Sequence, residues 1–238
     1  MFTKIAVVGT GNVGTWLFQT LQNQSNFEVH SFSSRKIELL PANFDLFIFA
    51  LKDDVYKEVL EQIPFKMPHA VHTSGSLSQN ILAPYSENFG VLYPYQSITD
   101  YELFDVPVCI EGSDLIFEDL LFKFASYVFS IVHKISEKQR FAMHLAAVFA
   151  NNFTNAMYEI AYQIFKENDL NWSLIFPLLE NTLEKAKHNA PHLVQTGPAV
   201  RNDVSIMEKH CNYLKNEDLK ELYKLISKVI NLLNIPNS

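Results

Sequence analysis

Little in this chain points to metal, disulfide, nucleic-acid or membrane chemistry. Its two cysteines, Cys109 and Cys211, lie far apart and have no CxxC spacing or histidine-rich companion. That usage indicates a reducing compartment, and we expect neither a disulfide framework nor a metal site. The net charge is −7, and the longest basic run is the pair Arg35-Lys36. Nucleic acids and anionic membranes are recognised by clustered cations, so we expect neither as a partner.

Long apolar runs are scarce as well. No stretch approaches the ~18 residues of a membrane span, and the start, MFTKIAVVGTGNVG, lacks the basic and apolar segments of a signal peptide. Apolar residues make up 48 % and charged residues 19 % of the 238 residues, a globular composition. We therefore expect a soluble, cytoplasmic protein with one large domain or two modest ones.

The first half of the chain alternates short apolar strands with helical patterns. Strands are predicted at 4–8, 27–32, 46–51, 70–73, 91–93, 107–110 and 129–133. Helices or helical turns are predicted at 13–21, 55–63, 79–84 and 115–125. This alternation predicts an α/β fold with a doubly wound, Rossmann-type, mostly parallel sheet.

The second half is helical throughout. Ser136 and Gln139 form a capping-box pattern, which opens a helix that continues to about Lys166. Further helices are predicted at 172–188, 204–214 and 217–233, and a Gly/Pro-containing loop at 189–203. We expect an α/β domain at 1–134 and an all-helical domain at 135–238.

A GxGxxG sequence joins the first strand to the first helix. Gly9 suits the tight turn, Gly11 lets backbone approach a pyrophosphate, and Gly14 lets helix and strand pack closely. The helix N-terminus then offers N–H groups to phosphates. The predicted dinucleotide-binding residues of this loop are Gly9, Thr10, Gly11, Asn12, Val13 and Gly14. The alternative is a glycine-rich turn without a ligand.

The end of the second strand bears on which nucleotide is bound. NAD-selective sites place an acidic residue about 20 residues after the last glycine, where this chain has Ser33, Ser34 and Arg35. A carboxylate would repel a 2′-phosphate, whereas hydroxyls and a guanidinium bind one, so NADP is the predicted cofactor. Alternatively, Arg35 and Lys36 are ordinary surface cations.

The third strand is expected to contribute to the same dinucleotide-binding site, which forms a trough at the edge of the sheet. Ligands of doubly wound sheets lie beyond the carboxyl ends of the strands, so Ala50, Leu51 and Lys52 are expected to line it. Asp53 or Asp54 is expected to cap the helix that follows.

The long helix has no Asp, Glu, Lys or Arg over residues 141–158. On an ideal α-helix His144, Asn151 and Asn155 share a face within an arc of about 40°, and Asn152 lies about 80° aside. The opposite face is predicted to be a core stripe of Phe149, Phe153, Ala156, Ile160 and Ile164.

An uncharged polar stripe suits a partly buried cleft or a subunit interface, because its side chains form hydrogen bonds without desolvating an ion. The alternative is an ordinary surface helix whose polar side is exposed to solvent. His144 is the candidate proton donor, since imidazoles exchange protons near neutral pH. A structural histidine is equally compatible with the pattern.

Two turns carry further candidates. The turn His72-Thr73-Ser74-Gly75-Ser76 follows a strand, so Ser74 either orients a substrate or belongs to a purely structural turn. Asp203 is expected to cap the next helix with Arg201 as its ion-pair partner. Arg201 as an anchor for an anionic substrate stays open.

Several stretches together resemble a known family. They are GTGNVG, SSRK, HTSGS, YPYQ at 93–96, Glu111-Gly112, the segment from His144 to Asn152, and the segment from Gly197 to Asp203. In order and spacing, over nearly the whole chain, they resemble Rossmann-like proteins related to deazaflavin-dependent NADP oxidoreductases. The helical domain of that group has no assigned function. Tyr93 stands where the family has histidine, and Asn202 where it has glycine.

The resemblance implies an NADP-binding domain, a helical domain that commonly mediates dimerisation, and oxidoreductase activity. We expect the helical domain, residues 135–238, to bind substrate and to form a homodimer. The resemblance also favours Asn152, whereas the helix angle favours Asn151 and Asn155. The resulting hypothesis is hydride transfer between NADP(H) and a small molecule at the domain junction. The proposed catalytic residues are His144, Ser74, Asn151 and Asn152, and the proposed substrate-binding residues are Asn155 and Arg201. The alternative is a non-catalytic, dimeric NADP-binding protein with a sensory or structural role.

Overall fold

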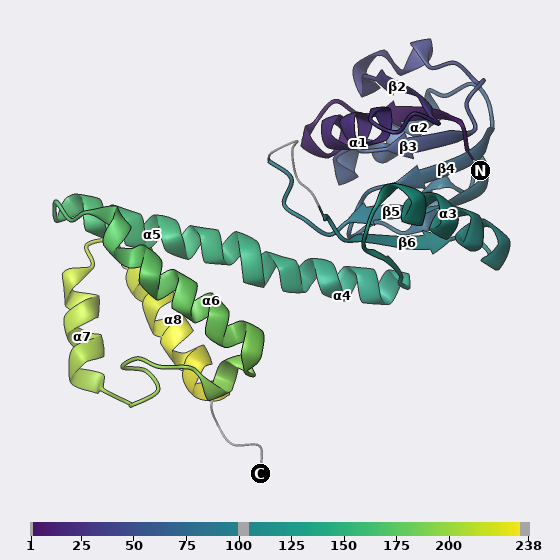
Figure 1. Cartoon of the computed structure of the whole chain (residues 1–238). Helices are drawn as coiled ribbons and strands as arrows, with labels where there is room; N and C mark the ends of the chain where they lie inside the picture. Colours follow the sequence, from purple (N-terminus) through teal and green to yellow (C-terminus); the bar gives the residue numbers. More distant parts are fainter. Residues whose placement is uncertain (1, 100–104, 234–238) are drawn as a thin grey trace. The chain divides into compact units, whose positions relative to one another are not determined.

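A computed structural model describes residues 2–99 and 105–233 (Figure 1). The chain divides into two compact units, Met1–Met157 and Tyr158–Ser238, and each is described by itself. The domain boundary expected near residue 134 stays an interpretation of the sequence, because the strand and helix composition changes there while the compact units divide further along the chain.

The first unit is built on a sheet that, within the described residues, has seven strands. They are β1 Lys4–Val8, β2 Glu28–Phe32, β3 Leu46–Phe49, β4 Met67–His72, β5 Ser86–Pro94, β6 Val108–Gly112 and β7 Val132–Lys134. Their order is β2-β1-β3-β4-β5-β6-β7, and every pair is parallel except β5 and β6. The predicted doubly wound, mostly parallel sheet is confirmed.

Helices cover both faces of this sheet (Figure 1). On one face α1 (Asn12–Gln22) and α3 (Leu115–Val128) pack through Trp16, Leu17, Leu21, Phe117, Leu121 and Phe124. On the other face α2 (Tyr56–Glu61) packs through Tyr56, Val59 and Leu60. Since the central strands are buried on both sides, their sequences KIAVV and LFIF are apolar without alternation.

Short 3₁₀ segments occur in both units. They are η1 Ser34–Leu39, η2 Asp53–Val55, η3 Gln79–Leu82, η5 Trp172–Ile175 and η6 Pro191–Leu193. The helical turn predicted at 79–84 is thus the 3₁₀ segment η3.

The predicted long helix is present but is not α-helical throughout. It begins at α4 (Glu137–Ala147), passes through a π-helical segment η4 (Val148–Phe153) and continues as α5 (Thr154–Glu167). The predicted capping box is confirmed, because Ser136 accepts from the backbone of Gln139 and the Gln139 side chain accepts from the backbone of Ser136. A π segment shifts every later residue around the axis, and such segments often occur at functional sites.

The second unit is helical, as predicted. It contains α6 (Phe176–His188), α7 (Val204–Tyr213) and α8 (Glu217–Leu233). Trp172 packs edge-on against the rings of Tyr162, Phe165 and Phe176. No helix within residues 2–99 and 105–233 combines the length and the hydropathy needed to cross a bilayer.

Candidate active site

The glycine loop has the geometry that its sequence predicts. Gly9 has φ +125°, and a methyl group on its Cα would lie 2.1 Å from the carbonyl oxygen of Ala50. A methyl group on Gly14 would lie 2.0 Å from the carbonyl oxygen of Gly9. At Gly11 no described atom lies within 4 Å of such a group. Gly9 and Gly14 are therefore needed for folding, whereas Gly11 borders open space at the start of α1.

A cavity of about 760 Å³, the Ser33 cavity, lies on one side of this loop. Ser33, Ser34 and Arg35 line it at the start of η1, where the Ser33 hydroxyl accepts from the Arg35 backbone. Arg35 is exposed, so its guanidinium is free to turn toward a ligand. The other residues that line this cavity are Gly9, Thr10, Gly11, Ala50, Leu51, Lys52, Val55, Glu58, Val59 and Gln62.

A second cavity of about 710 Å³, the His144 cavity, shares Gly11, Ala50, Leu51 and Lys52 with the first. It lies within the first unit, bordered by the ends of the strands and by the helix that runs from α4 into η4. Among the predicted site residues, those that line this cavity but not the Ser33 cavity are Asn12, Val13, Ser74, His144, Asn151 and Asn152. The structure therefore brings together the glycine loop and most of the uncharged helical stripe.

The His144 ring lies beside two residues from different strand ends. The Tyr93 hydroxyl at the end of β5 lies 3.3 Å from His144 Nδ1, and the rings meet edge-on. A methyl group on Gly75 would lie 2.7 Å from the same nitrogen and 3.0 Å from Tyr93 Cζ. Burial, followed by the nearby Tyr95 and Cys109, raises the pKa of Tyr93 to about 12. The family resemblance marked Tyr93 only as a departure from histidine, and the structure places its hydroxyl beside His144.

The π segment changes which asparagines accompany His144. Asn151 and Asn152 both line the His144 cavity, and Asn155 is not among its lining residues. Asn152, which the helix angle set aside, thus borders the same cavity as His144, whereas a role for Asn155 stays a prediction from the sequence. The helix angle assumed 100° per residue across a segment that is wound more loosely. The family resemblance, which favoured Asn152, identified the lining residue that the helix angle missed.

The predicted apolar core stripe of this helix is also wrong for the part that belongs to the first unit. Phe149 is 62 % and Phe153 is 49 % exposed, and their rings contact each other edge-on. The first unit alone does not bury these side chains.

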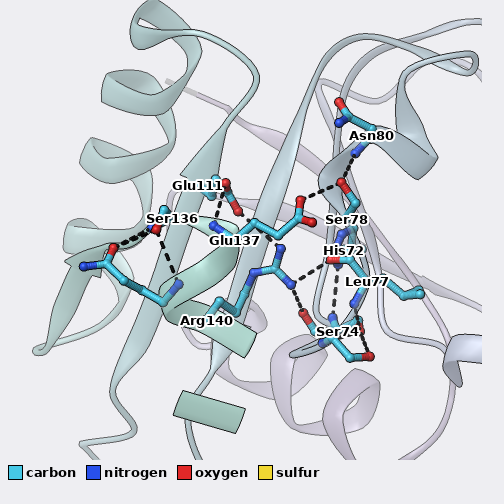
Figure 2. A network of polar contacts seen from close by, with 11 residues as sticks. His72, Ser74, Leu77, Ser78, Asn80, Glu111, Ser136, Glu137 and Arg140 are labelled. Carbon is cyan, nitrogen blue, oxygen red and sulfur yellow. Dashed lines mark hydrogen bonds and ion pairs between the residues drawn. The ribbon is translucent and has the colours of Figure 1, made fainter. Parts of the chain in front are cut away.

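A buried arginine that the sequence analysis did not single out attaches α4 to the sheet (Figure 2). Arg140 is 0 % exposed, and its Nη1 donates to the carbonyl oxygens of Ser74 at 3.0 Å and Leu77 at 2.7 Å. Its Nη2 pairs with Glu111 Oε2 at 3.2 Å, and Glu111 also accepts from the backbone of Glu137. Arg140 lies one turn before His144, so this network fixes the helix where it enters the site. The only signal in the sequence is that Arg140 is the last charged residue before the uncharged stretch at 141–158.

The turn after β4 belongs to the same network. Ser74 Oγ accepts from the backbones of Ser76 and Leu77, so this hydroxyl shapes its own turn. His72 is buried and its Nδ1 accepts from the Ser74 backbone. Burial, together with the nearby Arg140, lowers the pKa of His72 to about 4. The imidazole of His72 is therefore neutral at physiological pH.

Asp53 and Asp54 do not act as the predicted helix cap. Lys52 occupies the cap position of η2, and no side chain there caps the helix. Asp53 instead accepts a hydrogen bond from the hydroxyl of Ser76. It joins the third strand's end to the turn after the fourth, at the border of the His144 cavity.

Arg201 and Asp203 lie in the second unit. Asp203 caps α7 as predicted, since its carboxylate accepts from the Ile206 backbone. The expected ion pair is absent from the described residues, where no salt bridge joins Arg201 to Asp203. Between them Asn202 has φ +52°, a conformation that glycine and asparagine adopt most readily. This conformation explains how asparagine can stand where the related family has glycine.

Residues 106–230, more than half of the chain, match the family described as a domain of unknown function, DUF2520. The chain belongs to this DUF2520 family. The matched region contains Glu111, Arg140, His144 and both cavity asparagines, and begins after the glycine loop. A search of curated proteins finds no significant match.

Solved structures resemble the whole chain. A provisionally assigned NADP oxidoreductase from Bacteroides fragilis, BF3122, is 28 % identical with a TM-score of 0.86, and the match covers 97 % of this chain and 98 % of that one. Protein TM1727 from Thermotoga maritima is 22 % identical with a TM-score of 0.70 over the same shares. A reductive aminase from Aspergillus terreus, solved with NADPH and ethyl-5-oxohexanoate, is 13 % identical with a TM-score of 0.69 over 98 % of each chain. Structural relatives of this chain thus include NADP oxidoreductases, and the predicted family resemblance is confirmed.

Proposed function

We propose that this protein is an NADP(H)-dependent oxidoreductase that interconverts a carbon–oxygen or carbon–nitrogen double bond of a small molecule and its reduced form by hydride transfer. The observation that carries the proposal is the pair of adjoining cavities. The Ser33 cavity and the His144 cavity share Gly11, Ala50, Leu51 and Lys52. An extended dinucleotide that crosses the glycine loop would occupy both.

The residues present fit NADP. Gly11 leaves room for a pyrophosphate beside the α1 N-terminus, where backbone N–H groups and the helix dipole favour phosphate. Ser33, Ser34 and Arg35 would hold a 2′-phosphate in the Ser33 cavity, which would place the nicotinamide in the other. The NADPH-bound reductive aminase of the same fold supports this choice of cofactor. When bound, the cofactor supplies or accepts the hydride.

The chain itself would move the accompanying proton. His144 borders the cavity, and an imidazolium there can protonate the oxygen or nitrogen of a substrate as its carbon takes the hydride. Asn151 and Asn152 would donate or accept hydrogen bonds that orient the substrate, and Ser74 would hold the turn beneath it. The roles of Asn155 and Arg201 in substrate binding rest on the sequence alone.

The helical second unit is proposed to complete the substrate site at the domain junction and to form a homodimer. Leucines on the surfaces of α6 and α8 support a covered apolar face, among them Leu178, Leu183, Leu225 and Leu232. The compartment proposed from the sequence is the cytoplasm.

Cofactor binding is the first test. NADPH is expected to raise the melting temperature well above the rise that NADH gives. Arg35→Ala should weaken NADPH binding about tenfold and leave NADH binding unchanged, because it removes one charge-assisted contact. Lys36→Ala is the matched control, since Lys36 does not line the Ser33 cavity. Equal stabilisation by both nucleotides would refute NADP selectivity.

Turnover is the second test. NADPH oxidation is screened with ketones, imines and a deazaflavin acceptor, and any activity should collapse in His144→Ala. Activity that survives this change would refute the role of His144. Binding of NADPH without any turnover would instead support the non-catalytic alternative.

A further inference from the structure

His144 has one ring nitrogen engaged by the protein and one that is not. Its Nδ1 faces the Tyr93 hydroxyl at 3.3 Å and the α-carbon of Gly75. Within the described residues no hydrogen bond engages Nε2. The two nitrogens of an imidazole point in widely divergent directions, so Nε2 is turned away from the contact with Tyr93. Because His144 lines the cavity, Nε2 is the atom available to a substrate.

Three features of the surrounding structure determine the position of the His144 ring. Gly75 allows the imidazole to approach because it has no Cβ. Tyr95, two residues after Tyr93, donates its hydroxyl proton to the carbonyl oxygen of Met143 at 3.2 Å and so fixes the backbone just before His144. Arg140 fixes the helix one turn earlier. The Tyr93 contact is therefore made by a ring with little freedom to move.

Acid–base exchange at Nε2 imposes a condition on Nδ1. An imidazolium that gives its Nε2 proton to a substrate becomes neutral with its remaining proton on Nδ1. An oxygen that accepts from Nδ1–H serves both charge states without rearrangement. The Tyr93 oxygen is in that place, and its raised pKa keeps it a neutral phenol rather than a phenolate. Its own O–H then remains as a second donor toward the cavity.

We propose that Tyr93 accepts a hydrogen bond from Nδ1–H of His144 and thereby fixes the tautomer in which Nε2 exchanges the substrate proton. In the reduction the double-bond carbon takes the hydride, its heteroatom takes the Nε2 proton, and His144 changes from imidazolium to neutral imidazole. The consequence for turnover rests on the proposed function, whereas the tautomer itself does not. Tyr93 is a positioning residue that acts through His144.

Nitrogen NMR of the histidine rings tests the tautomer directly. The protein is labelled with ¹⁵N at its eight histidines, and the His144 signals are assigned by their loss in His144→Gln. At pH about 9, where imidazoles are neutral, His144 is expected to carry its proton on Nδ1. In Tyr93→Phe it should shift toward the Nε2–H form that predominates in free imidazole. Tyr127→Phe is the matched control and should keep the native tautomer, since that phenol is exposed and contacts Asn26.

Turnover gives an independent readout. With a substrate found in the screen, Tyr93→Phe should lower kcat about tenfold, the effect of one hydrogen bond, with a smaller change in KM. A native His144 that carries its proton on Nε2, or a tautomer unaffected by Tyr93→Phe, would overturn the proposal. If the tautomer responds as expected but no substrate consumes NADPH, the positioning by Tyr93 stands and the proposed oxidoreductase function fails.

Discussion

Gly75 lies so close to His144 that a methyl group on its α-carbon would come within 2.7 Å of the imidazole Nδ1. The sequence marked Gly75 as a turn residue, but it is the side chain across the cavity that excludes a larger residue here. A glycine from the turn after β4 thus sets where the candidate proton donor lies.

We predict that Gly75→Ala displaces the His144 ring and lowers kcat about 100-fold, since misplacement of a catalytic group by about 1 Å can have this effect. Steady-state kinetics and the melting temperature are measured together. The control is the same change in a His144→Ala background, where the methyl group no longer meets the imidazole and only the Tyr93 ring remains close, at 3.0 Å, so the loss of stability should be smaller. An equal loss of stability in both backgrounds would show that His144 is not the residue that requires glycine.

Substitutions of the two glycines at the start of α1, Gly11 and Gly14, should affect cofactor binding and folding differently. Gly11→Ala meets no described atom and its backbone, φ −77° and ψ −175°, suits alanine. We predict a change of less than about 1 kcal/mol in the free energy of unfolding, from the poorer helix cap. NADPH affinity, measured by calorimetry, should fall at least about tenfold because the methyl group occupies the approach to the phosphates.

Gly14→Ala is the counterpart, because its methyl group would lie 2.0 Å from the Gly9 carbonyl oxygen. It should destabilise the protein by about 1–3 kcal/mol even without nucleotide. The interpretation of the loop as a phosphate site would be wrong if Gly11→Ala bound NADPH as tightly as the native protein.

The sheet was predictable because its central strands are buried on both faces and their sequences are apolar throughout. The glycine loop and the capping box marked the neighbouring elements, so the bounds of β1 and α1 and the start of α4 were predicted within one or two residues. The cavity-lining position of Lys52 followed from the rule that ligands bind beyond the carboxyl ends of parallel strands, and those of Ser33 and Arg35 from their distance after the glycine loop.

The features that the sequence did not predict depend on contacts between distant segments. No local signal distinguishes the π segment from α-helix, so the angle assumed for Asn152 was wrong. Arg140 belongs to a helix whose first turn carries ordinary charges, and its burial depends on carbonyl oxygens more than 60 residues earlier in the chain. Asp53 was expected to serve its own helix but instead binds Ser76 across the strand ends.

The buried pair of Arg140 and Glu111 should make a large contribution to the stability of the first unit. Glu111→Gln leaves the guanidinium, 0 % exposed, without its counter-charge, and we predict a loss of about 3 kcal/mol or more. Urea unfolding is followed by the fluorescence of Trp16 in a Trp172→Phe background, so that only the first unit is observed.

The control for this pair is Glu184→Gln, which breaks the exposed ion pair with Lys187 in the second unit. Such pairs contribute at most about 1 kcal/mol, so this variant should leave the Trp16 transition in place. If Glu111→Gln lowered the free energy of unfolding by no more than about 1 kcal/mol, the carbonyl contacts of Arg140 would be enough to stabilise its buried charge without the carboxylate.

The stability of the first unit should also depend on pH through His72. Burial lowers its pKa from 6.5 to about 4 in the folded protein. Between these values the unfolded chain binds a proton that the folded protein does not, so acid favours unfolding. The contribution of His72 to the free energy of unfolding is therefore fully present above about pH 6.5 and is lost as the pH falls toward 4. The total loss is about 3 kcal/mol.

Urea unfolding of the Trp172→Phe protein at several pH values between 7 and 4 measures this slope through Trp16. His72→Asn keeps a side-chain acceptor for the Ser74 backbone but does not titrate, so its curve should be flatter over this range. His192→Asn replaces an exposed histidine of the second unit and should keep the native slope. If His72→Asn loses stability with acid as steeply as the native protein, the acid sensitivity arises from other groups and His72 is not buried in its neutral form.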